Sequence, residues 1–268
     1  MPPPANSTLG ERVSQLIQSL QFSWFVGHVL TLIGTFVYAL SYITFRANVK
    51  PYKIAYLGAL VSYGVVIYKT HGIPRINSAY VQRMVVDENV QYFLLALYWF
   101  FSSPVEVTLI PFATFSTFHS LGYIRTNIIP TVFPVPRQAS GSNTPATWQA
   151  KTQQAIKSWT DKNYGYAMRF VATAEVTIIM PRLVLGLFRL RLVPVFLYAQ
   201  FLRFRFHLSS YTRQAFAELR TNMDRALLPP TASAHIPPMV SQLYTTAKAM
   251  VIKYGESAVQ RQPAPGQQ

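Results

Sequence analysis

A few ionisable side chains lie inside long apolar runs of this chain, where they could carry protons or cations. The carboxylates in such runs are Glu106 and Glu175, and one of the imidazoles there is His119. An ionisable group is costly to bury in lipid, so its presence in a membrane segment indicates a function or a partner. One hypothesis is therefore a small transporter or channel that uses Glu106, Glu175 and His119.

The other interpretation of these groups is structural, and the sequence favours it. A transporter core usually contains more ionisable groups, together with interrupted helices in two related halves, whereas this chain has no apparent internal repeat. Glu175 can pair instead with Arg182 or Arg169, and Glu106 lies beside a break at which a bend could bring it to the surface. The imidazoles in apolar runs can likewise bond to neighbouring helices.

Enzymatic and metal-binding patterns are absent from the sequence. The five histidines are scattered, no two of them have the spacing of metal ligands on one helical turn, and there is no cysteine. A phosphate-binding loop, a Gly-x-Ser-x-Gly elbow and an HExxH motif are also missing. We therefore predict a non-enzymatic protein that holds no metal and no cofactor.

The composition indicates a membrane protein. Half of the 268 residues are hydrophobic, only 12% are charged and the mean hydropathy is +0.20, whereas soluble domains carry about 25% charged residues. These values argue against a soluble enzyme and against intrinsic disorder. The 24 Lys and Arg residues outnumber the 9 Asp and Glu residues, which gives a net charge of +15. Because the cations lie beside apolar runs, they favour an anionic bilayer over nucleic acid as the partner.

The first apolar stretches predict an all-α integral membrane protein. Residues 22–45 contain no charged side chain and are long enough to cross the hydrocarbon. Residues 52–69 form a shorter second span, and Pro51 is predicted to mark the turn between the two. Residues 1–21 are polar and include a short helix; a glycosylation triplet at Asn6 matters only if this end is lumenal.

The two later apolar stretches are interrupted. Residues 90–124 are too long for one upright helix, so they form either a kinked, tilted span or a hairpin of two shorter helices. Residues 170–202 contain four charged side chains, each costing about 2.5–3.5 kcal/mol at the bilayer centre, which favours a shallow hairpin. The loop 125–169 between them is basic and is predicted to be cytosolic. These stretches complete a membrane domain over residues 22–202.

The C-terminal part, residues 203–257, is basic and amphipathic, and residues 258–268 form a tail predicted to be disordered. Apolar residues recur at three- and four-residue steps on two predicted helices, and cations border them. Such helices lie in the membrane interface, with cations at anionic headgroups and apolar side chains inserted. The predicted headgroup-binding residues are Arg203, Arg205, Arg213, Arg220, Arg225, Lys248 and Lys253, and the predicted inserting residues are Phe216, Leu219, Leu243, Tyr244 and Val251.

Two stretches resemble a known family. Residues 91–124 and residues 201–220, which read FLRFRFHLSSYTRQAFAELR, are similar to the best-marked blocks of the transmembrane protein 33 family, which includes the fungal pore membrane protein 33. The resemblance implies a non-enzymatic, multi-pass protein of the endoplasmic reticulum membrane and nuclear envelope, with reticulon-type membrane proteins and nucleoporins as partners. It also implies cytosolic termini, which the charge pattern supports for the C-terminus and leaves open for the N-terminus.

The residue pattern and the resemblance together lead to a structural function. Hairpins and amphipathic helices that occupy the cytosolic leaflet favour positive curvature. We therefore expect a protein that shapes or stabilises curved membrane and supports nuclear pore assembly or distribution. A further alternative is a membrane-anchored adaptor, in which the C-terminal helices dock a protein instead of lipid.

Overall fold

The computed structural model describes residues 8–46, 48–74, 77–134, 147–233 and 236–256, and over these residues it contains helices and no strand. The all-α prediction is thus confirmed. Asn6, residues 135–146 of the loop predicted over 125–169, and the tail 258–268 lie outside these residues. The chain divides into two compact units, residues 1–174 and residues 175–268, and each is considered by itself.

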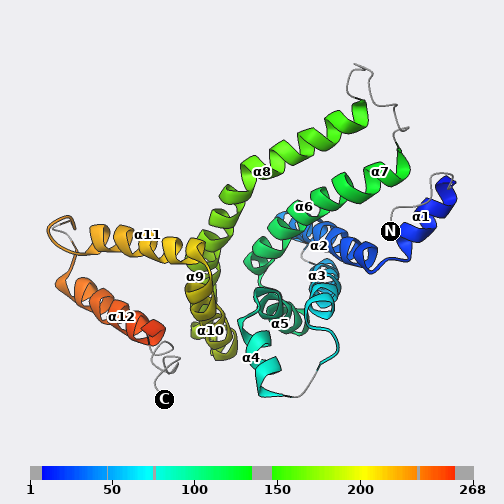
Figure 1. Ribbon diagram of the computed structural model, residues 1–268. Helices are drawn as coiled ribbons and strands as arrows, with labels where there is room; N and C mark the ends of the chain where they lie inside the picture. Colours follow the sequence, from blue (N-terminus) through cyan, green and yellow to red (C-terminus); the bar gives the residue numbers. More distant parts are fainter. Residues whose placement is uncertain (1–7, 47, 75–76, 135–146, 234–235, 257–268) are drawn as a thin grey trace, which may run out of the picture. The chain divides into compact units, whose positions relative to one another are not determined.

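The described part of the first unit is helical (Figure 1). Its α-helices are α1 (Leu9–Ile17), α2 (Leu20–Ile43), α3 (Val49–His71), α4 (Ser78–Val86), α5 (Glu88–Phe101), α6 (Ile110–Tyr123), α7 (Ile129–Val132) and α8 (Trp148–Ala174). A 3-10 turn, η1 (Glu106–Leu109), precedes α6, and a π-helical turn, η2 (Ile124–Ile128), follows it.

Short polar residues decide where the first five helices begin. The side-chain oxygens of Thr8, Ser19, Asn48, Asn77 and Asp87 each accept a hydrogen bond from a backbone N–H of the helix that follows. These bonds satisfy donors that have no partner within the helix, which favours helix initiation at those positions.

The cap at Asn48 makes the second predicted span longer than its apolar run. Helix α3 contains 23 residues, and at about 1.5 Å per residue it is long enough to cross a hydrocarbon layer of about 30 Å. Pro51 lies in the first turn of α3, where a missing N–H is tolerated. The prediction that Pro51 marks the turn was therefore wrong, because the helix has already begun at that residue.

Helices α2 and α3 pack through small residues. A Cβ atom on Gly34 would lie 2.6 Å from the Ala55 backbone nitrogen, and one on Gly58 would lie 2.4 Å from the Gly27 carbonyl oxygen. The Thr31 hydroxyl donates across the interface to the Ala55 carbonyl at 3.1 Å. Close backbone approach and interhelical hydrogen bonds hold helices together in lipid, where the hydrophobic effect between helices is weak.

The chain reverses between α5 and α6. Lys53, near the start of α3, donates to the carbonyls of Phe100 and Ser102 at the end of α5, whereas His71 at the end of α3 contacts Asp87 at the start of α5. Helix α5 therefore runs antiparallel to α3. Helix α6 begins at the Lys53 end, since the Tyr56 hydroxyl contacts Thr108 just before it at 2.7 Å.

Helix α6 then runs along α2 to the opposite end of the bundle, where α2 and α5 begin. The ring of Trp24, near the start of α2, lies 5.2 Å from that of His119, and the ring of Phe25 stacks on Tyr123 at 4.6 Å. Of the two arrangements that the sequence left open for residues 90–124, the structure shows the pair of helices. Figure 1 shows these helices against the α2–α3 pair.

The second unit contains a hairpin followed by two helices. Its elements are η3 (Glu175–Ile179), α9 (Met180–Val184), η4 (Leu185–Arg189), α10 (Leu192–Leu208), α11 (Ser210–Leu227) and α12 (Pro238–Glu256). Leu190 adopts a left-handed conformation with φ 56° and ends the first arm. Helix α10 then runs back, and it brings Arg205 to within 3.7 Å of Glu175.

Among the helices of the described chain, two are long and apolar enough to cross a membrane: Leu20–Ile43, and the helical run Trp148–Arg189 that continues from α8 through η4. The helical content and these segments identify an all-α membrane protein.

Candidate membrane-binding site

Asp224 joins helices α11 and α12. Its carboxylate accepts two hydrogen bonds of 2.7 Å from Lys248 and one of 2.6 Å from the Tyr244 hydroxyl. The hydrogen bond from Lys248, together with that from Tyr244, lowers the pKa of Asp224. Partial desolvation and the hydrogen bond to Asp224 raise the pKa of Tyr244 to about 12. At neutral pH the Asp224 carboxylate is therefore ionised and the Tyr244 hydroxyl is protonated.

The contact with α11 uses the polar side of α12 and leaves an apolar face of α12 exposed. Ser241 also takes part in the contact, since its hydroxyl donates to the Leu227 carbonyl at 2.8 Å. On the other side, Met239, Leu243 and Met250 are 77%, 69% and 66% exposed. Spacings of four and seven residues place these three side chains on one stripe of a helix. Val251, also exposed, lies beside this stripe.

The predicted inserting residues are thus divided by the structure. Leu243 and Val251 are exposed on α12, whereas the Tyr244 hydroxyl is bound to Asp224. On α11, Leu219 is half-buried, and the ring of Phe216 packs against that of Phe206 at 5.7 Å. Met239 and Met250 were missed, although their spacing from Leu243 already placed them on the same helical face.

Arg205 differs from the other predicted headgroup ligands because it is buried. Its side chain is 5% exposed, and it pairs with Glu175, whose side chain is 0% exposed. Glu175 therefore has a partner that the sequence did not suggest, since only the return of α10 brings the two together. Arg205 is accordingly removed from the proposed set of headgroup-binding residues.

Three other predicted cations have intramolecular partners. Arg213 donates to the carbonyls of Phe206 and His207 at the end of α10, and the guanidinium of Arg203 lies 5.0 Å from the ring centre of Tyr254. Lys248 is bound to Asp224, as described above.

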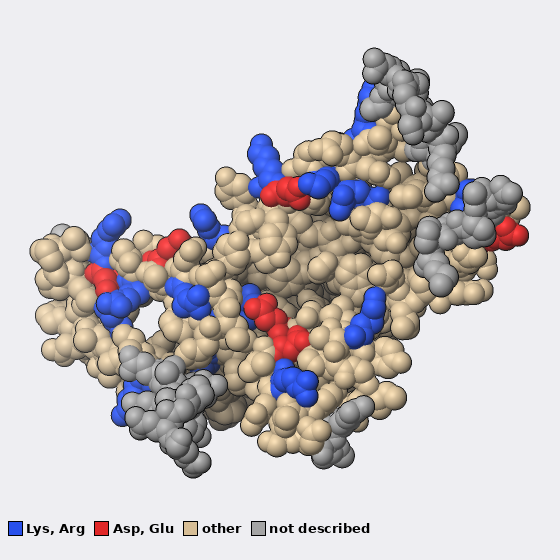
Figure 2. All heavy atoms as spheres, in the orientation of Figure 1, with Lys and Arg blue, Asp and Glu red and all other residues tan. Residues whose placement is uncertain are grey.

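Arg220, Arg225 and Lys253 are exposed, and Arg220 lies 3.6 Å from Asp224. Figure 2 shows that cationic side chains on the face drawn are dispersed among uncharged surface instead of gathered in one patch.

The tip of the hairpin is a second exposed apolar surface in this unit. Phe188 and Leu190 are 89% and 86% exposed, and Leu192 is 63% exposed. Arg189 and Arg191 alternate with them. An apolar tip that carries arginines suits the boundary between acyl chains and headgroups, because long cationic side chains extend from hydrocarbon to phosphate.

The residues of the transporter hypothesis are not brought together within the first unit. Glu106 begins η1 at the end of the bundle where α3 starts, whereas His119 lies near Trp24 at the start of α2. Glu175 belongs to the second unit and pairs with Arg205. Across the residues with described positions, no group of three His, Cys, Asp or Glu side chains could hold a metal ion.

Comparisons with known proteins place these observations in a family. The family model described as Transmembrane protein 33/Nucleoporin POM33 matches residues 3–257. Nucleoporin POM33 of Chaetomium thermophilum is 34% identical over 262 residues, which cover 92% of this chain and 90% of that protein. Tetra-spanning protein 1 of Schizosaccharomyces pombe is 34% identical over 94% of this chain and 90% of its own length.

A third relative is the pore membrane protein of 33 kDa of Saccharomyces cerevisiae, which is 30% identical over 95% of this chain and 90% of its own length. No solved structure matches the chain.

Proposed function

The chain belongs to the transmembrane protein 33/nucleoporin POM33 family, and on that premise we propose that it is a non-enzymatic pore membrane protein. We place it in the nuclear envelope and in the endoplasmic reticulum membrane. There it stabilises curved membrane and supports the assembly or distribution of nuclear pores. The names of two relatives, a nucleoporin and a pore membrane protein, support the pore role.

The observation that carries the curvature proposal is the exposed apolar face of α12. Polar contacts hold helix α12 to α11. Met239, Leu243 and Met250 lie outside this contact and remain exposed. Apolar side chains beside an exposed cation, Lys253, suit insertion between headgroups of an anionic leaflet. Insertion into one leaflet expands that leaflet and favours positive curvature.

The proposed topology has several membrane segments and a cytosolic C-terminus. Helices α2 and α3, the α5–α6 pair, and the hairpin that ends with α10 are the membrane segments. The basic segment 125–169 that follows α6 supports a cytosolic side for the end of the bundle where α6 finishes, because cytosolic segments that flank membrane helices are enriched in Lys and Arg. The name of a relative, tetra-spanning protein 1, is consistent with four membrane segments. Nucleoporins and reticulon-type proteins are the proposed partners.

The proposal is tested with the full chain in giant vesicles from which a narrow membrane tubule is drawn. Labelled wild-type protein is expected to be denser on the tubule than on the flat vesicle. The double variant Leu243→Ser/Met250→Ser is expected to lose most of this enrichment. The matched control is Val81→Ser/Val85→Ser, which changes two exposed apolar residues of α4.

Equal density of the wild type on tubule and vesicle would overturn the curvature proposal. If the α12 double variant were enriched as strongly as the wild type, α12 would not be the lipid-binding element. The adaptor alternative, in which α12 docks a protein, would then take its place.

A further inference from the structure

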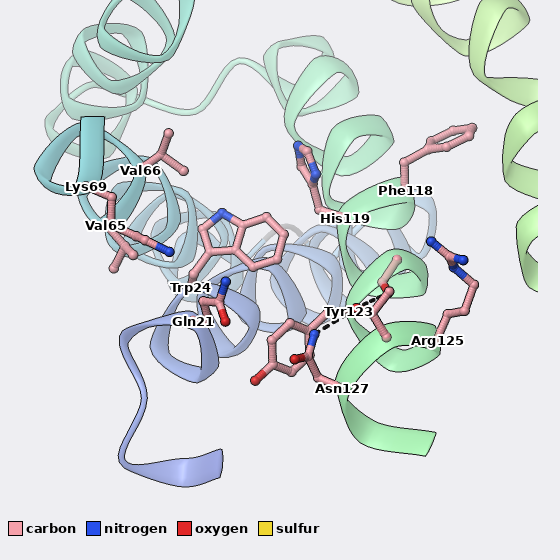
Figure 3. A pocket seen from close by; sticks show the side chains of 12 residues that line it. Gln21, Trp24, Val65, Val66, Lys69, Phe118, His119, Tyr123, Arg125 and Asn127 are labelled. Atoms are coloured by element: carbon pink, nitrogen blue, oxygen red, sulfur yellow. Dashed lines mark hydrogen bonds between the residues drawn. The ribbon is translucent and has the colours of Figure 1, made fainter. Parts of the chain in front are cut away.

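The first unit contains a cavity of about 390 Å³ that the proposed function does not use. It lies at the end of the bundle where α2 begins, α3 ends and α6 passes into η2 (Figure 3). Its volume falls within the range of small-molecule sites. The lining residues used below are Gln21, Trp24, Val65, Val66, Lys69 and His119.

The lining is amphipathic and cationic. Trp24, Val65 and Val66 supply apolar walls, and Figure 3 shows Lys69 and His119 approaching the indole of Trp24 from different sides. Arg125 is a second lining cation, on the other side of the α6–η2 helix in this view. The lining residues include no Asp or Glu. The cavity therefore favours a ligand with a negative charge at one end and an apolar remainder.

The cavity lies at the boundary between apolar and polar sequence. The apolar run of α2 begins at Phe22, directly after Gln21, and the apolar part of α3 ends immediately before Lys69. In a bilayer this level corresponds to the boundary between acyl chains and headgroups. Basic pockets between membrane helices bind anionic lipid headgroups, and an ammonium forms strong, charge-assisted hydrogen bonds to phosphate.

We propose that this cavity binds one anionic glycerophospholipid. The Lys69 ammonium hydrogen-bonds the phosphate, the Gln21 amide and His119 lie beside the headgroup, and an acyl chain lies along Val65, Val66 and Trp24. The bound lipid contacts α2, α3 and α6 together, so it stabilises the bundle at this end. The site is separate from the α12 surface and does not depend on curvature.

The experiment uses the purified full chain in detergent, with native mass spectrometry to count bound lipid and thermal unfolding to follow stabilisation. The probes are phosphatidylserine, phosphatidylcholine, inorganic phosphate and soluble glycerophosphoserine. Phosphatidylserine is expected to bind one to one and to raise the unfolding midpoint. The other three probes are expected to bind more weakly, because each lacks either the net negative charge or the acyl chain.

Two variants with matched controls test the residues. Lys69→Gln is expected to weaken phosphatidylserine binding roughly five-fold, the effect of one headgroup cation near a membrane. Lys50→Gln, the same change at the exposed other end of α3, is expected to have no effect. Val66→Trp fills the cavity and should abolish binding, whereas Val61→Trp, at an exposed position of α3, should retain it.

Four outcomes would overturn the proposal. Lys69→Gln could bind as Lys50→Gln does, or Val66→Trp could retain the lipid. Phosphatidylcholine could bind as tightly as phosphatidylserine, which would remove the role of charge. Inorganic phosphate or glycerophosphoserine could stabilise as strongly as phosphatidylserine, which would make the cavity a site for a free anion. Thermal unfolding of Val66→Trp in the absence of lipid shows whether this variant folds. If it does not fold, the Lys69→Gln result alone tests the proposal.

Discussion

The two units of this protein differ in how they use small and polar residues. In the first unit such residues join helices: Gly34 and Gly58 allow close packing of α2 and α3, and hydroxyls such as that of Thr31 bond across the interface. In the second unit polar contacts hold α12 at one edge and leave its apolar face outward. Adhesion of helices in lipid requires packing and hydrogen bonds, which the first unit supplies. Attachment to a lipid surface requires exposed apolar side chains, which is the role we propose for the second unit.

The largest expected effect concerns the exception in the second unit, its buried ion pair. Glu175→Gln leaves Arg205 buried opposite a neutral amide, which should lower the free energy of unfolding by about 3–5 kcal/mol. Unfolding of the full chain in detergent measures this. The double variant Glu175→Leu/Arg205→Leu should recover much of the loss, because it leaves no unpaired charge.

A suitable control for the ion pair is Asp161→Asn, which breaks the exposed Lys157–Asp161 pair of α8. Exposed pairs of this spacing contribute about 0.3–0.5 kcal/mol. Equal effects of Glu175→Gln and Asp161→Asn would contradict the burial of Glu175.

The next effect tests adhesion in the first unit. Gly34→Ala places a Cβ atom 2.6 Å from the Ala55 backbone nitrogen, so α2 and α3 must separate, and we expect a loss of about 1–3 kcal/mol. At Gly122 the same substitution meets open space, and the higher helix propensity of Ala should stabilise by up to about 1 kcal/mol. A lower unfolding temperature for Gly34→Ala together with a higher one for Gly122→Ala would support close packing of α2 and α3. A higher unfolding temperature for both variants would contradict it.

A smaller effect depends on pH at the junction of α4 and α5. Asp87 caps α5 through Asn89 and contacts His71 at 2.6 Å. Burial raises the pKa of Asp87, but the hydrogen bonds from His71 and from Asn89 outweigh burial and hold the pKa below its usual value. A carboxylate with a depressed pKa contributes stability above its unfolded pKa, near 3.9, and this is lost as the pH falls through the folded pKa.

Asp87→Asn tests this contribution. At neutral pH it should lower stability by about 0.3–1 kcal/mol, because Asn still caps α5 but lacks the negative charge that is favourable at a helix N-terminus. The difference from wild type should shrink below about pH 4, as the wild-type carboxyl becomes protonated. A difference that stayed constant from pH 7 to pH 3 would show that the Asp87 charge has no role.

The smallest effect concerns α12, the helix proposed to insert into lipid. Asp224→Asn weakens the bonds from Lys248 and Tyr244, so hydrogen exchange in α12 should become faster while the unfolding midpoint of the whole chain stays nearly unchanged. Glu218→Gln on the same helix provides the control. Unchanged exchange in α12 would show that Asp224 does not hold it to α11.

Much of the fold was predictable because helices in lipid are long and apolar. The apolar stretches predicted helices near those of the structure, and the residue pattern predicted exposed Leu243 and Val251. The extension of α3 to Asn48 was missed because a hydropathy pattern does not reveal a helix start that depends on capping by one polar residue. The cavity at Lys69 was also missed, since its lining comes from segments about 40 to 50 residues apart that share no local pattern.

The sequence by itself determined the class of protein, the family and the helical segments, because composition and hydropathy act along the chain. It also determined which helices are amphipathic. Only the tertiary structure decided which cations stay exposed. Arg205 and Arg213 have the same charge, yet the return of α10 buries Arg205 against Glu175, while Arg213 remains at the surface. Burial depends on which segment the fold brings opposite a side chain, and that partner lies 30 residues away in the chain.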